Sequence, residues 1–373
     1  MTDRTSDNPP KSEPKIPIDR GIPSTSGPSA WSDGDVKRRP VYVGHKKRRI
    51  PPWTVAIAVF ALLMVGLFVI LPRLIDRDPR VVVPDPSGVE RPSHRVPPAD
   101  ENAAVVTVAS TPVFASPDPR SERRAEALFN ERVDIIDARD RIFLGVRLSD
   151  GVRGYIRREA ASADTRSVSP EGTVARVIVR TASKRVMSDA RRGYVMVEAP
   201  MGSVMYADYR RGDLLRLRLP KGETGWINVS GVLILPPEAS VVPEDDAAAS
   251  FASTLMAFVD CPWVPGGATV RGISPEGALH VAGRLHGLSL PRDRAALMRM
   301  GEDIRASEAR EGDVYYFHRP GDRTRVDAVG MRVADNQLLM ATFDQTTLHV
   351  IDLDSETYEA QAALLLSVKR YIP

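Results

Sequence analysis

Two short stretches decide the fold of this chain: PWVPGG at Pro262–Gly267 and GISPEG at Gly272–Gly277. Both combine Pro and Gly in a way that is typical of tight loops. The second runs directly into EGALHVAGRLHG (276–287), whose apolar spacing predicts a helix. Residues 247–258 and 292–301 predict two more helices, and alternating strands are expected over 312–319, 327–335, 337–344 and 348–354. The sequence therefore predicts an α+β domain over residues 247–373.

Composition and charge exclude several classes of function. The 373 residues carry a net charge of +3, but residues 1–50 alone hold 11 Lys+Arg against 6 Asp+Glu, which leaves −2 for the remainder. The basicity belongs to a local tail, so we expect no nucleic-acid partner for the folded part. The single cysteine, Cys261, allows neither an intrachain disulfide nor a cysteine-based metal cluster. The six histidines show no metal-ligand spacing, and we expect no metal and no cofactor.

The N-terminal part predicts a tail, one membrane span and a tether. Residues 1–50 are rich in Pro, Ser, Asp and Lys, and we expect them to be disordered. Residues 53–71 form an uncharged apolar run long enough for one transmembrane helix, with no small-residue cleavage site of a signal peptide after it. Residues 73–103 contain six prolines and predict a stiff, extended linker.

The charges beside the predicted span indicate its orientation. Seven Lys and Arg at 37–39 and 46–49 precede it with no acid among them, whereas three Arg at 73–80 are interleaved with two Asp. By the positive-inside rule the N-terminus is cytoplasmic and everything after Leu71 is outside the membrane. We therefore expect a single-pass protein of the bacterial cytoplasmic membrane, with periplasmic C-terminal domains.

Two small β units are predicted between the linker and the C-terminal domain, at 104–163 and 172–236. In each, short alternating runs lead to a Gly–aromatic–Ile triplet, Gly154–Ile156 and Gly225–Ile227. These triplets resemble the Gly-Trp-Val/Ile signature of bacterial SH3-like domains, which implies small barrels. We expect Tyr155 and Trp226 to fill the interiors of their own barrels.

The C-terminal domain resembles the NlpC/P60 family of papain-like peptidases, which cut peptide stems of peptidoglycan. The resemblance rests on five motifs in order: Pro262–Gly267, Gly272–Gly277, Leu290–Arg292, Glu311–Phe317 and Ala328–Val333. With two SH3-like units in front, the arrangement is most similar to the subgroup that cleaves γ-D-glutamyl–diamino-acid bonds. Asp150–Ile156 resembles that subgroup's D-G-Y-x-G-W segment, with Val152 where a tyrosine helps to close the substrate pocket.

The resemblance also locates the catalytic positions, and none holds a competent residue. The family's nucleophilic cysteine matches Pro275, its histidine base matches Ala328, and its orienting histidine matches Met340. A thiolate mechanism needs a thiol, a proton acceptor and a group that orients it, and none of these three side chains supplies one. We therefore expect an inactive peptidase fold, and we take no catalytic residue from it.

Two hypotheses of function follow from these observations. In the first, a pseudoenzyme binds peptidoglycan stem peptides or an envelope partner protein, with Trp263, Gly267, Ser274, Asp150 and Tyr155 as candidate binding residues. In the second, the chain is an active wall endopeptidase with a relocated nucleophile, Cys261 or Ser274, although no histidine occupies a base position of the family. The oligomeric state does not follow from the sequence.

The predicted topology can be tested directly. A reporter that is active only outside the cytoplasm, fused after Pro373, should be active, because the flanking charges place the C-terminus across the membrane. A matched reporter that is active only in the cytoplasm should be silent at the same position. The opposite pair of results would overturn both the orientation and the cell-wall interpretation.

Overall fold

The computed structural model describes Met64 and residues 102–243, 246–341 and 346–372. Among these residues, no helix combines the length and the apolar character needed to cross a membrane. The predicted tail (1–50), span (53–71) and linker (73–103) lie outside the described residues, apart from Met64, Asn102 and Ala103.

The first β unit is a seven-stranded antiparallel arrangement with the order β3-β2-β6-β5-β4-β1-β7. Its strands are β1 (Ala103–Val106), β2 (Ser110–Phe114), β3 (Arg123–Leu128), β4 (Arg132–Asp137), β5 (Phe143–Arg147), β6 (Arg153–Arg157) and β7 (Ala161–Ser162). Alternate positions of these strands are apolar, and their side chains meet in a core that includes Val113, Val146 and Ile156.

The second β unit repeats the first strand for strand. Its order is β10-β9-β13-β12-β11-β8-β14, which is the order of the first unit with every number raised by seven. The strands are β8 (Ala175–Val179), β9 (Ser183–Met187), β10 (Val195–Pro200), β11 (Val204–Arg211), β12 (Leu214–Arg218), β13 (Thr224–Asn228) and β14 (Val232–Leu235). The two predicted β units therefore share one topology.

The structure corrects the expected position of the two aromatic residues. In each triplet the Gly and the Ile point into the barrel: Gly154 and Gly225 are buried, and Ile156 and Ile227 belong to the two cores. Because side chains alternate along a strand, the aromatic residue between them points outward. Tyr155 and Trp226 are accordingly half-buried on the outer surfaces and fill neither barrel.

The C-terminal domain combines four α-helices with a six-stranded antiparallel sheet of order β17-β22-β18-β19-β20-β21. The helices are α3 (Ala247–Leu255), α4 (Pro275–Leu285), α5 (Arg294–Arg299) and α6 (Glu356–Ala362). The strands are β15 (Ala268–Thr269) and β16 (Gly272–Ile273), which pair with each other, then β17 (Glu302–Ile304), β18 (Val314–Arg319), β19 (Asp322–Ala334), β20 (Gln337–Met340), β21 (His349–Asp352) and β22 (Leu365–Arg370).

The expected helices and strands of this domain are observed with small shifts of their ends. The helix predicted over 247–258 ends at Leu255 and continues as a 3₁₀ turn, Met256–Phe258. The domain is α+β as predicted, while the described chain as a whole is mostly β-sheet with few, short helices. β17, β22 and α6 were not predicted from the sequence.

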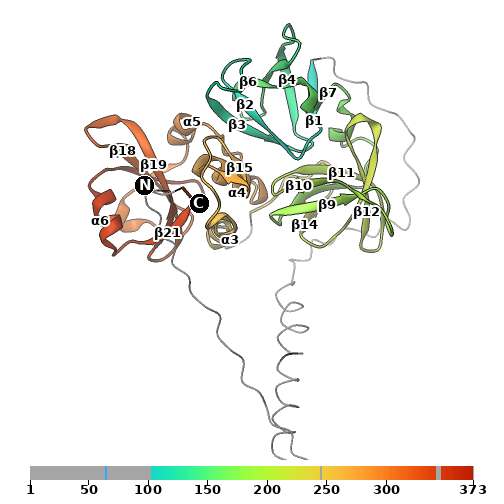
Figure 1. Ribbon diagram of the computed structural model, residues 1–373. Helices are drawn as coiled ribbons and strands as arrows, with labels where there is room; N and C mark the ends of the chain where they lie inside the picture. Colours follow the sequence, from blue (N-terminus) through green and yellow to red (C-terminus); the bar gives the residue numbers. More distant parts are fainter. Residues whose placement is uncertain (1–63, 65–101, 244–245, 342–345, 373) are drawn as a thin grey trace, which may run out of the picture. The chain divides into compact units, whose positions relative to one another are not determined.

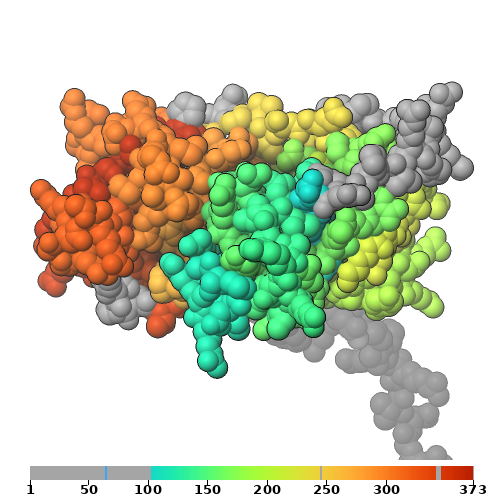
Figure 2. Space-filling view, turned by 90° about the horizontal axis from the view of Figure 1, so that it is seen from above, coloured from blue at the N-terminus to red at the C-terminus, as the bar shows by residue number. Residues whose placement is uncertain are grey.

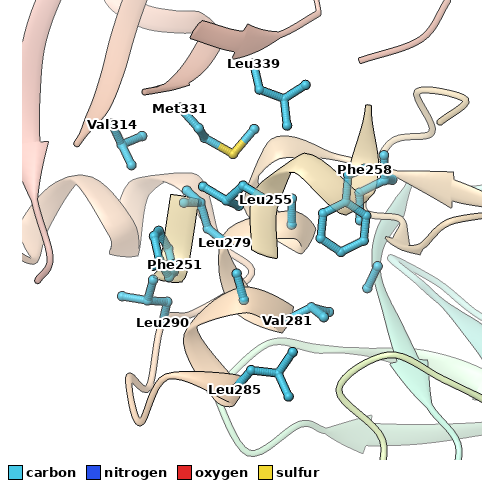
Figure 3. Close-up of a cluster of buried hydrophobic side chains, with 14 of the residues drawn as sticks. Phe251, Leu255, Phe258, Leu279, Val281, Leu285, Leu290, Val314, Met331 and Leu339 are labelled. Carbon is cyan, nitrogen blue, oxygen red and sulfur yellow. The ribbon is translucent and has the colours of Figure 1, made fainter. Parts of the chain in front are cut away.

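One core joins the helices of this domain to one face of its sheet. Figure 3 shows Met331 and Leu339 of the sheet directed at Leu255 of α3 and Leu279 of α4. Val281 and Leu285, on the other side of α4, point toward the β units. The same cluster includes Leu128 of the first unit and Ile178 of the second. The three parts of the chain therefore share one hydrophobic core. Figure 1 shows α3 and α4 between the six-stranded sheet and the two β units.

The turn between β3 and β4, Leu128–Glu131, connects all three parts. Leu128 is buried in the shared core, whereas its neighbour Phe129 is buried in the core of the second unit. Asn130 adopts a left-handed conformation (φ 58°), and its amide donates to the Val204 carbonyl of β11 at 2.9 Å. In the space-filling view the first unit, in green, touches both the orange C-terminal domain and the yellow-green second unit (Figure 2).

Truncation of Phe129 tests this connection. Phe129→Ala should lower the free energy of unfolding by about 3–5 kcal/mol, because it leaves a cavity in a core of another unit. The control is Ile142→Ala, whose side chain is 61% exposed and should change stability by less than about 0.5 kcal/mol. Urea unfolding measures both, and equal effects of the two substitutions would contradict the assignment.

Candidate binding cleft

The two stretches that decide the fold are held together by backbone contacts that require glycine. A Cβ on Gly277 would lie 1.9 Å from the carbonyl oxygen of Gly267. The same carbonyl accepts the backbone N–H of Ser274 at 3.0 Å, so the PWVPGG loop lies directly on the start of α4. The Oγ of Ser274 accepts the Gly277 N–H at 3.1 Å and caps the helix. These contacts fix the PWVPGG loop against the N-terminus of α4, and this loop and the helix start together form one side of the cleft.

A cleft of about 840 Å³ opens between this helix start and the first β unit. The C-terminal domain contributes mainly Trp263, Ser274, Glu276, Asp293, Arg294 and Arg299, and the first unit contributes Glu122, Arg123, Arg124, Val152 and Arg153. The volume is within the range of small-molecule and peptide sites.

The three positions matched to catalytic residues lie in two different places. Pro275 is the first residue of α4, where a missing N–H is tolerated. Ala328 on β19 and Met340 on β20 are buried in a separate apolar cluster with Phe317 and Ile351. They alternate along their strands with residues that face α4, so they point to the opposite face of the sheet. The structure brings Ala328 and Met340 together, but not with Pro275.

An ion pair lies in the first turn of α4. The Oε1 of Glu276 accepts the Nε–H of Arg294, and Glu276 is 6% exposed. Arg294 Nη1 also donates to the carbonyl oxygen of Val326 on β19 at 2.8 Å. Arg294 therefore links the start of α4 to β19 through charge-assisted hydrogen bonds.

The candidate binding residues have different positions. Trp263 lines the cleft with 43% of its surface exposed, and Ser274 lines it with its hydroxyl engaged in the helix cap. Gly267 acts through its carbonyl, as described above. Asp150 lines the cleft, but its carboxylate is bonded to Arg292. Tyr155 lies outside the cleft, on the outer face of β6 beside its strand partner Gly145.

Comparison with known proteins agrees with this geometry. A family model described as the bacterial dipeptidyl-peptidase SH3 domain matches residues 113–160. A gamma-D-glutamyl-L-lysine dipeptidyl-peptidase of Bacillus cereus is 22% identical over 158 residues, 42% of this chain and 46% of that protein. The chain thus matches about half the length of this curated relative. A solved NlpC/P60 family protein from Bacillus cereus superimposes with a TM-score of 0.64 at 15% identity, over 73% of this chain and 100% of the other.

The fold is that of NlpC/P60 proteins. The predicted resemblance to this family is confirmed, and so is the SH3-like domain in front of the C-terminal domain.

Arg292 ties the NlpC/P60-like domain to the first β unit. Its guanidinium donates to Glu131 at 2.6 Å and to Asp150 at 2.7 Å, and its side chain is 1% exposed. Burial raises the pKa of both carboxyls, but the charge and hydrogen bonds of Arg292, together with the other cationic groups nearby, outweigh burial and hold each pKa at about 2. A third bond, from Nη1 to the carbonyl oxygen of Glu126 at 2.8 Å, ends on β3. Arg292 and Asp150 line the cleft, so this network joins its two walls.

His280 belongs to the same buried network. Its Nδ1 lies 2.6 Å from the carbonyl oxygen of Leu290 and its Nε2 lies 3.0 Å from Arg284. A carbonyl only accepts and a guanidinium only donates, so the ring carries its proton on Nδ1 and is neutral. Burial lowers the pKa of His280, and the charges of Arg292 and Arg284 lower it further. This histidine is therefore structural and has no proton acceptor role in the cleft.

Cys261 is poorly placed for a nucleophile. It is half-buried, its Sγ lies 3.9 Å from the carbonyl oxygen of Ala257, and it does not line the cleft. Burial raises the pKa of the thiol, and the charge of Asp260 raises it further, which disfavours the thiolate. Within residues 102–372, as far as they are described, no group of His, Cys, Asp and Glu is arranged to hold a metal ion.

Sequence reasoning missed the arginines of the cleft. Arg124, Arg153 and Arg299 are exposed, and none forms an ion pair with another described residue. The PRDR run at 291–294 gave a signal only for Arg292 and Arg294, which lie on the cleft wall formed by the C-terminal domain. Arg124 and Arg153 come from the first β unit, and only the fold brings them to the opposite wall.

Removing Arg292 tests its structural role. Arg292→Ala should destabilise the protein by about 3–5 kcal/mol, because Glu131 and Asp150 would remain buried without a partner. Arg299→Ala is the matched control, since this arginine is exposed and unpaired, and it should cost less than about 0.5 kcal/mol. Both follow from urea unfolding curves. A small effect of Arg292→Ala would show that the two carboxylates find other partners.

The same network predicts loss of stability in acid. The pKa of His280 is lowered in the folded protein, so its contribution is complete above the unfolded value of 6.5 and is lost as the pH falls. The slope should reach about 1.4 kcal/mol per pH unit between about pH 6 and 4, and the carboxyls of Glu131 and Asp150 add to it below about pH 4. His280→Gln should flatten the upper part of this profile. An unchanged profile in that variant would contradict the assignment.

Proposed function

We propose that this protein is a membrane-anchored, extracytoplasmic pseudoenzyme that binds peptidoglycan stem peptides without cleaving them. The observation that carries the proposal is a cleft kept open at the position of a peptidase site, while the catalytic positions hold Pro275, Ala328 and Met340. The fold and the named activity of the Bacillus cereus relative support a cell-wall role.

The charge of the cleft supports an anionic ligand. Arg124 and Arg153 project from the first unit and Arg299 from α5, without acidic partners among the described residues. Stem peptides carry free carboxylates, which arginine recognises through paired hydrogen bonds. Trp263 adds an exposed ring at the same cleft against which an apolar side chain can pack.

Membrane anchoring is part of the proposal and rests on the sequence of residues 53–71. A single helix there, with the N-terminus in the cytoplasm, would hold the binding cleft on the periplasmic side of the cytoplasmic membrane. An envelope protein as the ligand of the cleft, in place of stem peptides, is the closest variant of this proposal.

The second candidate function is an active γ-D-glutamyl–diamino-acid endopeptidase with an unconventional site. It would need a thiolate at Cys261 or an activated hydroxyl at Ser274. Cys261 lies outside the cleft with a raised thiol pKa, and the Ser274 hydroxyl is bonded within the helix cap. Neither arrangement favours a nucleophile, and the binding function is therefore preferred.

The proposal predicts binding without turnover. The full chain incubated with purified muropeptides should release no product above background, and Cys261→Ser should change nothing, because no base accompanies the thiol. The triple change Pro275→Cys, Ala328→His, Met340→His should also give no turnover, since the two new histidines would enter a cluster on the other face of the sheet. Mass spectrometry of the products measures this. Turnover that Cys261→Ser abolishes would sink the pseudoenzyme proposal.

Binding is measured by calorimetry with the same muropeptides. The pair Arg124→Glu and Arg153→Glu should weaken binding by about tenfold or more, because two charge-assisted contacts would become repulsive. The pair Arg211→Glu and Arg323→Glu, at two exposed positions that do not line the cleft, makes the same change of charge and is the matched control. If muropeptides fail to bind while an envelope protein is captured through the same arginines, the ligand class is wrong and the cleft assignment stands.

A further inference from the structure

We propose that the second β unit binds an acidic, extended polypeptide segment of a partner protein in a groove between β9 and β13. This groove, the β9–β13 groove, has a volume of about 370 Å³. Its lining residues include Lys184, Arg185, Met187, Asp189, Trp226 and Asn228, and none of them lines the cleft described above. The inference concerns another surface and another ligand and does not rest on the proposed function.

The groove exists because two neighbouring strands separate. Within the described second unit, β9 and β13 are paired at a single position, Met187 opposite Trp226. On their other sides the two strands are fully paired, β9 with β10 and β13 with β12. Beyond the single pair the gap is bridged by the Lys184 amine, which donates to the Asn228 Oδ1 at 2.5 Å and to the Ser230 carbonyl. The separated strand edges present main-chain groups of the kind that an extended peptide pairs with.

Trp226 lines the groove, and two further aromatic side chains lie near it on the outer face of the barrel. Trp226 meets Tyr209 edge to face, with ring centroids 6.1 Å apart, and the Arg216 guanidinium lies 5.6 Å from the centre of the Tyr209 ring. Tyr209 is 42% exposed, and Tyr194, in the loop that follows β9, is 72% exposed. Tyr, Trp and Arg are the residues most enriched at the energetic centres of protein interfaces. An outward tryptophan in this setting is therefore available to a partner.

The charge of the unit indicates an acidic partner. Residues 172–236 hold 11 Lys and Arg against 5 Asp and Glu, a net charge of +6, whereas residues 247–373 hold 13 against 16, a net of −3. Arg191 and Arg192 are exposed in the loop beside the groove. The one acidic residue among those that line the groove, Asp189, accepts the backbone N–H groups of these two residues at 2.9 and 3.1 Å. Complementary charge of this kind steers association and selects partners.

A polypeptide fits these features better than an anionic glycan. Both would use the arginines and the aromatic rings, but the unpaired strand edges of β9 and β13 offer main-chain pairing that only a polypeptide can return. The depth of the groove suits a side chain of the bound segment, inserted beside Trp226 and Met187.

The test measures fluorescence anisotropy of a labelled Glu–Tyr copolymer peptide titrated with the full chain. The wild type should bind it, and the pair Arg191→Glu and Arg192→Glu should weaken binding by about tenfold or more. Tyr194→Ser should weaken it by about threefold or more, since its ring is exposed beside the groove. These residues are exposed, so the variants should stay folded, which circular dichroism checks. The control pair Arg120→Glu and Arg323→Glu makes the same change of charge on other exposed surfaces and should alter binding less than about twofold.

Two outcomes would overturn the inference. One is a wild type that does not bind the copolymer, or a control pair that weakens binding as much as the groove variants. The other is tighter binding of polygalacturonate than of the copolymer, lost in the same groove variants, which would make the groove a glycan site. Muropeptide binding in the cleft should be unchanged by Arg191→Glu and Arg192→Glu, so failure of this inference and failure of the proposed function give different results.

Discussion

The architecture depends on the buried pairing of Arg292 with Glu131 and Asp150. Neither carboxylate belongs to the domain that supplies the arginine, so the network exists only when the first β unit and the NlpC/P60-like domain are docked. Glu131 also ends the turn that inserts Leu128 and Phe129 into two different cores. Charge pairing and apolar burial thus act at the same point of the chain. The walls of the cleft come from these same two parts, so the way the two parts dock sets the width of the cleft.

The residues at the positions matched to catalytic residues and the glycines of the scaffold are explained by different physical constraints. The glycines of the PWVPGG and GISPEG stretches remain because any Cβ at Gly277 or Gly267 would collide with backbone. Pro275, by contrast, lies at a helix position that accepts proline at little cost. Ala328 and Met340 fill a well-packed apolar cluster in which histidine would need a hydrogen-bond partner. The stability of the fold therefore does not require the chemistry for which the resembling family is known.

Local signals in the sequence predicted most of the C-terminal domain and little of the cleft's charge. The helices over 247–258 and 276–287 and the four strands that follow were predictable because apolar period and turn residues are properties of short windows. Tyr155 and Trp226 were misplaced because composition does not show which residue of a Gly–aromatic–Ile triplet faces inward. Arg124, Arg153 and the Arg292 partners are separated from the α4 region by more than 100 residues, and no local pattern reports contacts of that range.

The core shared by the three parts affects how the protein unfolds and how it is degraded. Leu128, Ile178 and the α3–α4 residues are buried against one another, so none of the three parts can open without exposing apolar surface of the other two. Such a molecule melts as one cooperative body instead of shedding domains in turn. A protease would then find either an intact substrate or a wholly unfolded one, and partly trimmed forms that keep a functional β unit should not accumulate. Quality control of this protein would act in an all-or-none manner.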